Sequence, residues 1–356
     1  MTGRCRGKPR LKVLLFGWQN PRSYGGIQSF VRDLRLASPA HLAFHVFPED
    51  LFDCAFEVAR GRFRRGKFVK RLAAFLQDGD FAVVHSHNLH FEARAHLAWL
   101  VERAAAWARI PHVLTIHDLP DIPAVCAGVA ELERTFLVTQ SRYNQRTIRN
   151  LTGRKAEVIP VGIDFRRFAD SPDRAPDCIA FPGRLTPAKG AADAVVVAAE
   201  LARRRGKMSP LFSYPTEETA GFLAGLRHLL AQFPLVQARF MGRRAIPGIY
   251  QRAAVTLALP LAAEGFGLAA LESLACGRPV VACPTGGMTE WLESAAGALV
   301  VRQRVLDPIV GALEEVLDDW QRWRTAAHQG RQTLEQRYDI RHIAAAHYEL
   351  YTRLRG

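Results

Sequence analysis

The sequence predicts an α/β protein made of two halves, each with its own parallel sheet. Short apolar runs alternate with longer amphipathic stretches along most of the chain. Strands that alternate with helices in this way are typical of parallel sheets with crossover helices. The chain has 356 residues, about the length of two ordinary domains. A polar stretch with two prolines, at 169–176, interrupts the alternation near the middle and is the expected junction.

Six short apolar runs in the first half are expected to form buried strands. They are Leu11–Phe16, Phe44–Phe47, Phe81–His85, His112–Ile116, Thr135–Val138 and Ala156–Pro160. Between them lie stretches whose apolar residues have helical spacing. These are Gln28–Leu36, Lys67–Gln77, Ala93–Ala108 and Arg142–Thr152.

The same alternation restarts after the junction. It runs through Cys178–Phe181, Ala191–Arg205, Leu211–Tyr214, Thr219–Gln232, Val236–Met241, Val255–Leu259, Gly267–Ala275 and Val280–Ala282. A final amphipathic stretch, Ile340–Leu354, is expected to be a helix whose packing partner the sequence leaves open.

The charge of the chain needs a reason. Lys and Arg number 48 against 34 Asp and Glu, a formal net charge of +14. Such an excess favours association with phosphates, nucleic acids or anionic membranes, and it carries no information about fold. The hydrophobic fraction of 49% is that of an ordinary globular protein, so a disordered or fibrous chain is excluded.

The cysteines and the hydropathy indicate a compartment. Six cysteines lie far apart, with no C-x-x-C pair and no metal-ligand spacing. Disulfide frameworks belong to small secreted chains. No apolar run approaches the roughly 18 residues of a membrane span. We therefore expect a reduced, cytoplasmic protein.

In an open parallel sheet, ligands bind beyond the carboxyl ends of the strands, so loops that follow strands are the places to look for chemistry. The loop after the first strand ends in Gly25-Gly26 at the start of a helix. Paired glycines there let backbone N–H groups approach an anion. A simple tight turn is the more common explanation of such a pair taken alone.

The first loop of the second half contains Gly183, Arg184, Lys189 and Gly190. Two cations before a helix make a suitable diphosphate site, although a solvated basic loop is the plainer alternative. The order of residues is not that of a Walker A loop.

The strongest pattern runs from Glu264 to Glu272 and includes Gly265 and Gly267. Two carboxylates eight residues apart, one before a glycine turn and one in the helix that follows, can accept hydrogen bonds from two sets of hydroxyls. The start of the helix would meanwhile face an anion. A nucleotide sugar offers this combination of sugar hydroxyls, diphosphate and ribose hydroxyls.

Taken together, these motifs resemble those of the retaining GT-B glycosyltransferases of family four, the group 1 glycosyl transferases. The matching segments appear in the family's order over nearly the whole chain. They are Gly25-Gly26, Val83–His87, Thr115–Asp118, Val158–Asp164, Gly183-Arg184 with Lys189-Gly190, and Glu264–Glu272. The family pattern usually has Asn where this chain has Val161, and the loop after the second strand of the second half lacks the usual glycine.

The resemblance implies a fold and a domain arrangement. Two Rossmann-like parallel-sheet domains would face each other across a cleft. The expected divisions are an acceptor-side domain at 1–168, a donor nucleotide-sugar domain at 169–336 and a helix at 337–356 that crosses back to the first domain.

The resemblance also implies a role for each matching residue. The expected catalytic residues, which meet the reacting sugar or the leaving diphosphate, are His117, Arg184, Lys189 and Glu264. The residues expected to bind the rest of the donor are Gly25, Gly26, Gly183, Arg243, Gly265, Phe266, Gly267, Leu268 and Glu272. A buried structural histidine is the alternative for His117.

The expected function is transfer of a hexosyl unit (glucosyl, N-acetylglucosaminyl or mannosyl) from a UDP-sugar, or less favourably a GDP-sugar, with retention of configuration. We expect no metal and no cofactor, because fixed cations and helix N–H groups can stabilise the leaving group. The acceptor is open among lipid-linked sugars, polysaccharide precursors and natural-product aglycones. The competing functions are another GT-B nucleotide-sugar enzyme such as an epimerase, a catalytically silent partner protein, and, least favoured, a nucleic-acid-binding protein.

A cationic segment at 60–71 carries seven Lys or Arg residues and no acid. Its side chains Arg62, Arg64, Arg65 and Lys67 are candidates for binding an acceptor or an anionic membrane at the inner face. A solvated helix face is the plain alternative. No nucleic-acid partner is expected, because no nucleic-acid-binding module is recognised.

Overall fold

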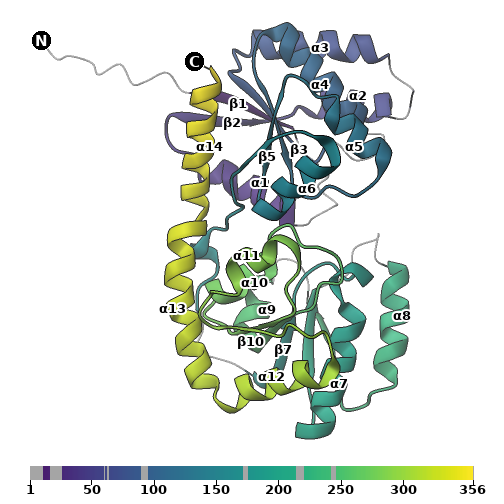
Figure 1. Ribbon diagram of the computed structural model, residues 1–356, viewed down its shortest axis with the longest axis vertical. Coiled ribbons are helices and arrows are strands. Elements are labelled where there is room, and N and C mark those ends of the chain that lie inside the picture. The colour runs from purple at the N-terminus through teal and green to yellow at the C-terminus, as the bar shows by residue number, and fades with distance from the viewer. Residues whose placement is uncertain are drawn as a thin grey trace, which may run out of the picture. The chain divides into compact units, whose positions relative to one another are not determined.

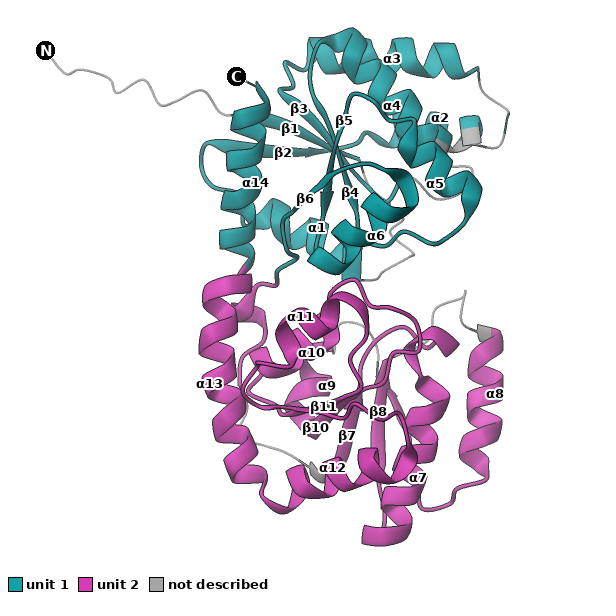
Figure 2. Ribbon diagram, viewed as in Figure 1, with its two compact units in different colours: residues 1–162, 340–356 teal, residues 163–339 magenta. Residues whose placement is uncertain are grey.

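The computed structural model describes residues 11–16, 26–59, 61, 64–89, 95–170, 175–213, 220–241 and 246–355. The chain forms two compact units, residues 1–162 with 340–356 and residues 163–339 (Figure 2). The expected boundaries lay after residues 168 and 336. Residues 163–168 belong to the second unit because Arg331 donates hydrogen bonds to the carbonyls of Phe165 and Phe168 at 3.1 and 2.6 Å.

The first unit contains a six-stranded parallel sheet with the strand order β2-β1-β3-β4-β5-β6 (Figure 1). The strands are β1 (Leu11–Phe16), β2 (Leu42–Val46), β3 (Val83–His87), β4 (His112–Ile116), β5 (Thr135–Thr139) and β6 (Ala156–Val158). The side chains of β1, β3, β4 and β5 are almost all buried, as expected for a sheet covered on both faces, and the edge strands β2 and β6 are partly exposed.

Helices connect these strands. They are α1 (Gly26–Leu36), α2 (Glu49–Ala59), α3 (Arg65–Asp78), α4 (Ala95–Ala108), α5 (Pro123–Ala130) and α6 (Arg142–Thr152). Helix α6 shows why its sequence forms a helix with sharp ends. Ser141 caps its first turn by accepting a hydrogen bond from the Asn144 amide at 3.2 Å, and Gly153 ends it at a φ of 72°.

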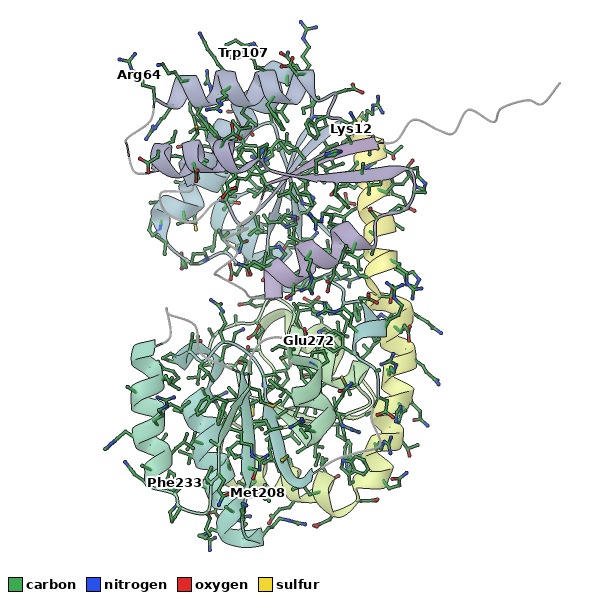
Figure 3. The ribbon with its side chains drawn as sticks, turned by 180° about the vertical axis from the view of Figure 1, so that it is seen from behind. Lys12, Arg64, Trp107, Met208, Phe233 and Glu272 are labelled. Atoms are coloured by element: carbon green, nitrogen blue, oxygen red, sulfur yellow. The ribbon has the colours of Figure 1, made fainter. Side chains whose placement is uncertain are left out.

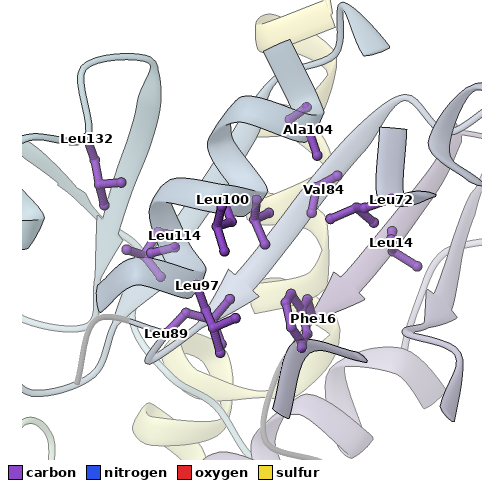
Figure 4. Packing of buried hydrophobic residues seen from close by; sticks show 14 of the residues in the cluster. Leu14, Phe16, Leu72, Val84, Leu89, Leu97, Leu100, Ala104, Leu114 and Leu132 are labelled. Atoms are coloured by element: carbon purple, nitrogen blue, oxygen red, sulfur yellow. The ribbon is translucent and has the colours of Figure 1, made fainter. Parts of the chain in front are cut away.

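The core of the first unit lies between the sheet and helices α3 and α4. Leu14, Phe16 and Val84 from the sheet pack with Leu72 and Leu100 from the helices (Figure 4). Each of these side chains is almost fully buried. The apolar residues that the strand and helix patterns place on the inner faces therefore pack together in one apolar layer.

The last helix, α14 (Ile340–Arg355), belongs to the first unit. The hydroxyl of Tyr351 lies 2.5 Å from the His85 ring of β3, and Arg353 pairs with Glu157 of β6. The C-terminal helix thus packs against a sheet that residues 11–158 form.

The second unit contains a second six-stranded parallel sheet, with the order β12-β11-β10-β7-β8-β9. Its strands are β7 (Ala175–Phe181), β8 (Ser209–Ser213), β9 (Arg239–Met241), β10 (Ala253–Ala258), β11 (Val280–Ala282) and β12 (Ala298–Val300). Its helices are α7 (Ala191–Arg205), α8 (Ala220–Ala231), α9 (Ile246–Arg252), α10 (Leu268–Ala275), α11 (Thr289–Leu292), α12 (Leu306–Asp318) and α13 (Trp320–Tyr338).

The prediction of a two-part α/β protein with parallel sheets is confirmed, and the expected strands and helices are present with ends shifted by a few residues. Helices α2, α5, α9, α11, α12 and α13 and strand β12 were not predicted. Helix α13 is mostly polar and buries only scattered residues such as Ala327, Gly330 and Leu334, so it has little apolar periodicity to detect. Gly330 allows a close approach, because a Cβ there would lie 2.1 Å from the Ala296 carbonyl oxygen.

None of the helices in the described ranges is long and apolar enough to cross a lipid bilayer.

Candidate functional site

The strand order of each sheet indicates where a ligand can bind. In the second unit the chain runs outward from β7 through β8 to β9, then returns to the other side of β7 as β10. The point of reversal therefore lies between β7 and β10, and ligands of open parallel sheets bind at such a point. The loops that follow these two strands, 182–190 and 259–267, contain seven of the thirteen residues expected to be catalytic or to bind the donor.

The loop after β7 opens with a turn that requires glycine. Gly183 has a φ of 141°, although the space around it would admit a Cβ. Ser213, at the end of β8, fixes the turn from the side. Its hydroxyl contacts the Gly183 carbonyl oxygen and lies 3.3 Å from the Gly183 amide. The next residue, Arg184, is exposed.

The two loops meet through a pair of charges. The ammonium group of Lys189 forms an ion pair with the Oε1 atom of Glu264, and both side chains are only partly exposed. The main chains also meet, since the amides of Leu261 and Ala262 both donate to the carbonyl of Ala188, at 2.9 and 3.2 Å. The structure thus brings together a cation and a carboxylate that lie 75 residues apart in the sequence.

Helix α10 begins directly after Glu264 at a glycine with little free space. Gly267 has a φ of 90°, and a Cβ there would lie 2.7 Å from the Cγ of Met288. Phe266 is buried and stacks on Trp291, whose indole N–H donates to the Phe266 carbonyl at 2.7 Å. Gly265 and Leu268 flank this anchored segment and are partly exposed. The Ala270 amide donates to the Gly267 carbonyl at 3.1 Å. The amides of Leu268 and Ala269 before it are those that an α-helix leaves without an internal acceptor, and such amides suit an anion.

Glu272 lies on α10, and a neighbouring phenol fixes its carboxylate (Figure 3). The Tyr250 hydroxyl of α9 donates to the Glu272 Oε2 atom at 2.5 Å. Burial, reinforced by this carboxylate, raises the pKa of Tyr250 well above its ordinary value, so the phenol remains a donor. Tyr250 was not selected from the sequence, because a tyrosine 22 residues before its partner has no motif to mark it.

In the first unit, His117 follows β4 and is held from several directions. Its amide donates to the Asn88 side chain at 2.9 Å, and its carbonyl accepts hydrogen bonds from Gln140 at 2.8 Å and Asn144 at 2.7 Å. Burial lowers the pKa of His117 to about 4, so the ring is neutral at pH 7. These partners were not predicted, because each is far from His117 in the sequence.

Both ring nitrogens of His117 have protein partners. The Gln140 amide nitrogen donates to the His117 carbonyl, so its Oε1 atom is the oxygen that lies 2.7 Å from His117 Nδ1. That Nδ1 must therefore carry the proton, and Nε2 accepts from His87 Nδ1 at 3.1 Å. His87 Nε2 is left as an acceptor, and it is buried with no hydrogen-bond partner among the residues that the structure describes.

Several other sequence-selected residues can be placed. Gly26 begins α1 and is exposed, and Arg64, Arg65 and Lys67 are exposed at the start of α3. Gly25, Arg62 and Arg243 lie outside the described residues.

Comparisons with known proteins place this geometry in context. A family model described as glycosyl transferases group 1 matches residues 176–319. Among curated proteins, the D-inositol 3-phosphate glycosyltransferase of Kribbella flavida is 27% identical over 297 residues, 70% of this chain and 66% of that protein. The protein of the same name from Actinosynnema mirum is 32% identical over 281 residues, 67% of this chain and 65% of that protein. The chain therefore covers slightly less than two thirds of these two relatives.

Solved structures extend the likeness over the whole chain. HepE of Anabaena, in a crystal structure with UDP and glucose, superposes with a TM-score of 0.78 at 17% identity and covers 97% of this chain and 100% of HepE. The sucrose-phosphate synthase of Thermosynechococcus elongatus superposes with a TM-score of 0.76 at 17% identity and covers 97% and 99% of the two chains. The similarity at this level of identity is one of fold.

Proposed function

We propose that the chain, which has the GT-B fold, belongs to the group 1 glycosyl transferases and transfers a hexosyl unit from a nucleoside diphosphate sugar to a hydroxyl group of an acceptor. The observation that supports this proposal best is the meeting of Lys189, Glu264 and the start of α10 at the β7–β10 reversal point. These groups offer a cation, a carboxylate and free amides within one site.

Each group has a defined part in the proposed reaction. Lys189 and Arg184 neutralise the diphosphate as the bond between the anomeric carbon and the phosphate oxygen breaks. Glu264 accepts hydrogen bonds from sugar hydroxyls, and the first amides of α10 contact the phosphates. Glu272, oriented by Tyr250, accepts from the ribose hydroxyls. The acceptor oxygen bonds to the anomeric carbon, and its proton passes to the departing phosphate.

We propose that this reaction retains the anomeric configuration and needs no metal ion. Two fixed cations and a helix start provide the positive charge that a metal would otherwise supply to the leaving group. No protein nucleophile is required, because the acceptor attacks on the face from which the diphosphate leaves. A chelator should therefore leave the rate unchanged.

We take a UDP-sugar as the donor and leave the hexose open. The structural neighbour HepE was crystallised with UDP-glucose, which favours uridine as the base. The acceptor is to be sought first among phosphorylated polyols, because the curated relatives are named as glycosyltransferases of D-inositol 3-phosphate. Lipid-linked sugars, polysaccharide precursors and small aglycones complete the panel.

The test is donor turnover by the purified protein. UDP-, GDP-, ADP- and TDP-sugars are incubated with chelator, and release of the nucleoside diphosphate is followed by mass spectrometry. We expect slow hydrolysis of one donor and its loss in Glu264→Ala. A rearranged sugar nucleotide without hydrolysis would indicate an epimerase. No release and no thermal shift with any nucleotide would indicate a silent partner protein and contradict the proposal.

We further propose that the outer surface of α3 and α4 associates with anionic membrane. Arg64, Arg65 and Lys67 are exposed at the start of α3, and Trp107, at the end of α4, is 55% exposed. Helices α3 and α4 pack together, and Figure 3 shows Arg64 and Trp107 both pointing outward from them. Cations and an exposed indole on the outer surface of one helix pair are suited to the interface of a lipid bilayer.

Vesicle co-sedimentation tests the membrane proposal. We expect binding to vesicles that contain phosphatidylserine, and its loss when the three cations of α3 are replaced by Ser. The matched control replaces three exposed arginines of the second unit, Arg227, Arg322 and Arg337, and removes the same charge. Equal losses in both variants, or no binding by the unmodified protein, would contradict the proposal.

A further inference from the structure

Arg304 connects parts of the second unit that the sequence keeps far apart. It lies in the segment between β12 and α12, and its side chain is only 29% exposed. Its guanidinium donates to the carbonyl of Leu259 at 2.9 Å and to the carbonyl of Pro260 at 3.0 Å. It also forms an ion pair with Asp193, at 2.5 Å. One planar group therefore has three acceptors on two other segments.

Those two segments belong to the proposed donor site. Asp193 lies in the first turn of α7, directly after the loop that contains Gly183, Arg184 and Lys189. Leu259 and Pro260 begin the loop that leads to Glu264. Arg304 itself follows β12, the outermost strand, so it reaches past β11 to the loops of β10 and β7.

The contact between the two segments is tight. Gly190, at the start of α7, has a φ of 76°, and a Cβ there would lie 2.0 Å from the Leu259 carbonyl oxygen and 2.9 Å from Arg304 Nη2. The same carbonyl oxygen accepts the hydrogen bond from Arg304. The Arg304 guanidinium thus binds where the loop of Lys189 contacts the loop of Glu264.

We propose that Arg304 is a positioning residue, which fixes the loop of Lys189 against the loop of Glu264 so that both reach the same donor. This inference rests on the proposed function, and Arg304 touches none of the reacting atoms. An arginine suits the task because its rigid fork of N–H groups reaches several acceptors at once, whereas lysine offers one ammonium.

Loss of the guanidinium has two effects at the diphosphate. The carbonyls of Leu259 and Pro260 lose a charged hydrogen-bond donor. The distance between the loop of Lys189 and the loop of Glu264 is then no longer fixed. The Asp193 carboxylate also loses its counter-charge near the start of α7, where it would repel a bound anion. Both effects weaken contacts to the diphosphate more than contacts to the nucleoside.

The experiment compares the affinity for UDP and for UMP by isothermal titration calorimetry. Arg304→Ala should raise the Kd for UDP at least tenfold and that for UMP less than threefold. The matched control is Arg302→Ala, which removes an arginine of the same segment that is 77% exposed and pairs only with Glu293 among the described residues. It should leave both Kd values within twofold of the unmodified protein.

The outcomes separate the inference from the function on which it rests. Equal UDP affinity in the two variants would overturn the role of Arg304, as would an equal loss of UDP and UMP affinity, which indicates general loosening. Failure of the unmodified protein to bind any of UDP, GDP, ADP and TDP would overturn the proposed function itself. If Arg304→Ala does not fold, Arg304→Lys is measured instead, and the same selective loss of UDP affinity is expected.

Discussion

Acid should unfold the first unit before the second. Five histidines of the first unit are almost fully buried: His85, His87, His112, His117 and His347. Burial lowers the pKa of each of them below the ordinary value of 6.5, chiefly because a charged ring would lose its hydration. No histidine among the described residues of the second unit is buried. Lowering the pH should therefore destabilise the first unit through its buried histidines and leave the second unit without this effect.

The sign follows from proton binding in the two states. The folded unit keeps these rings neutral, whereas the unfolded chain protonates them below pH 6.5. The free energy of unfolding is therefore fully present above pH 6.5 and falls as the pH drops toward the folded pKa values.

Three histidines have pKa values that allow an estimate. These are about 3 for His112, about 4 for His117 and about 4 for His347. At pH 5, each of these histidines lowers the unfolding free energy of the first unit by about 2 kcal/mol relative to neutral pH. The three together lower it by about 6 kcal/mol. That is a large part of the roughly 5 to 15 kcal/mol that stabilises an ordinary domain.

Hydrogen exchange measures the loss of unfolding free energy separately in each unit. The exchange is followed by mass spectrometry at pH values from 7 to 4.5, and the rates are corrected for pH. Peptides from β3, β4 and α14 should lose protection near pH 5, and peptides from β7 and β10 should keep it. Loss of protection in both units at the same pH would refute the reasoning. The variant His347→Phe removes one acid-sensitive group, so its stability should change about 2 kcal/mol less between pH 7 and pH 5.

Three further changes test the local geometry. Tyr250→Phe removes the donor to Glu272 and should raise the Kd for UDP several-fold in calorimetry, and an unchanged Kd for UDP would argue against this role of Tyr250. Gly267→Ala forces a Cβ to within 2.7 Å of Met288 at a φ of 90°, so chemical denaturation should show a loss of about 1 to 3 kcal/mol, and an unaltered midpoint would contradict the strain. Ser141→Ala removes the cap of α6 and should cost about 1 kcal/mol in the same assay, whereas a neutral result would show that water replaces the cap.

The sequence determined the elements and the loops that matter. Strands such as Leu11–Phe16 and His112–Ile116, and helices such as Arg142–Thr152 and Ala191–Arg205, have the predicted bounds because their apolar spacing and their caps lie within the segment itself. The turns at Gly183 and Gly267 could be predicted for the same reason. Their positive φ angles favour glycine, so the residue type itself marks the turn in the sequence.

The tertiary structure alone decided how those loops are joined. The tautomer of His117 depends on Gln140 and His87, the orientation of Glu272 depends on Tyr250, and the link between the donor loops depends on Arg304. The partners come from separate parts of the chain, and Gln140, Tyr250 and Arg304 belong to none of the motifs selected from the sequence. Hydrogen bonds and ion pairs form between groups that folding brings within about 3 Å of each other. The sequence therefore indicates which residues can belong to the site, and only the packing of strands and helices determines which partners they contact.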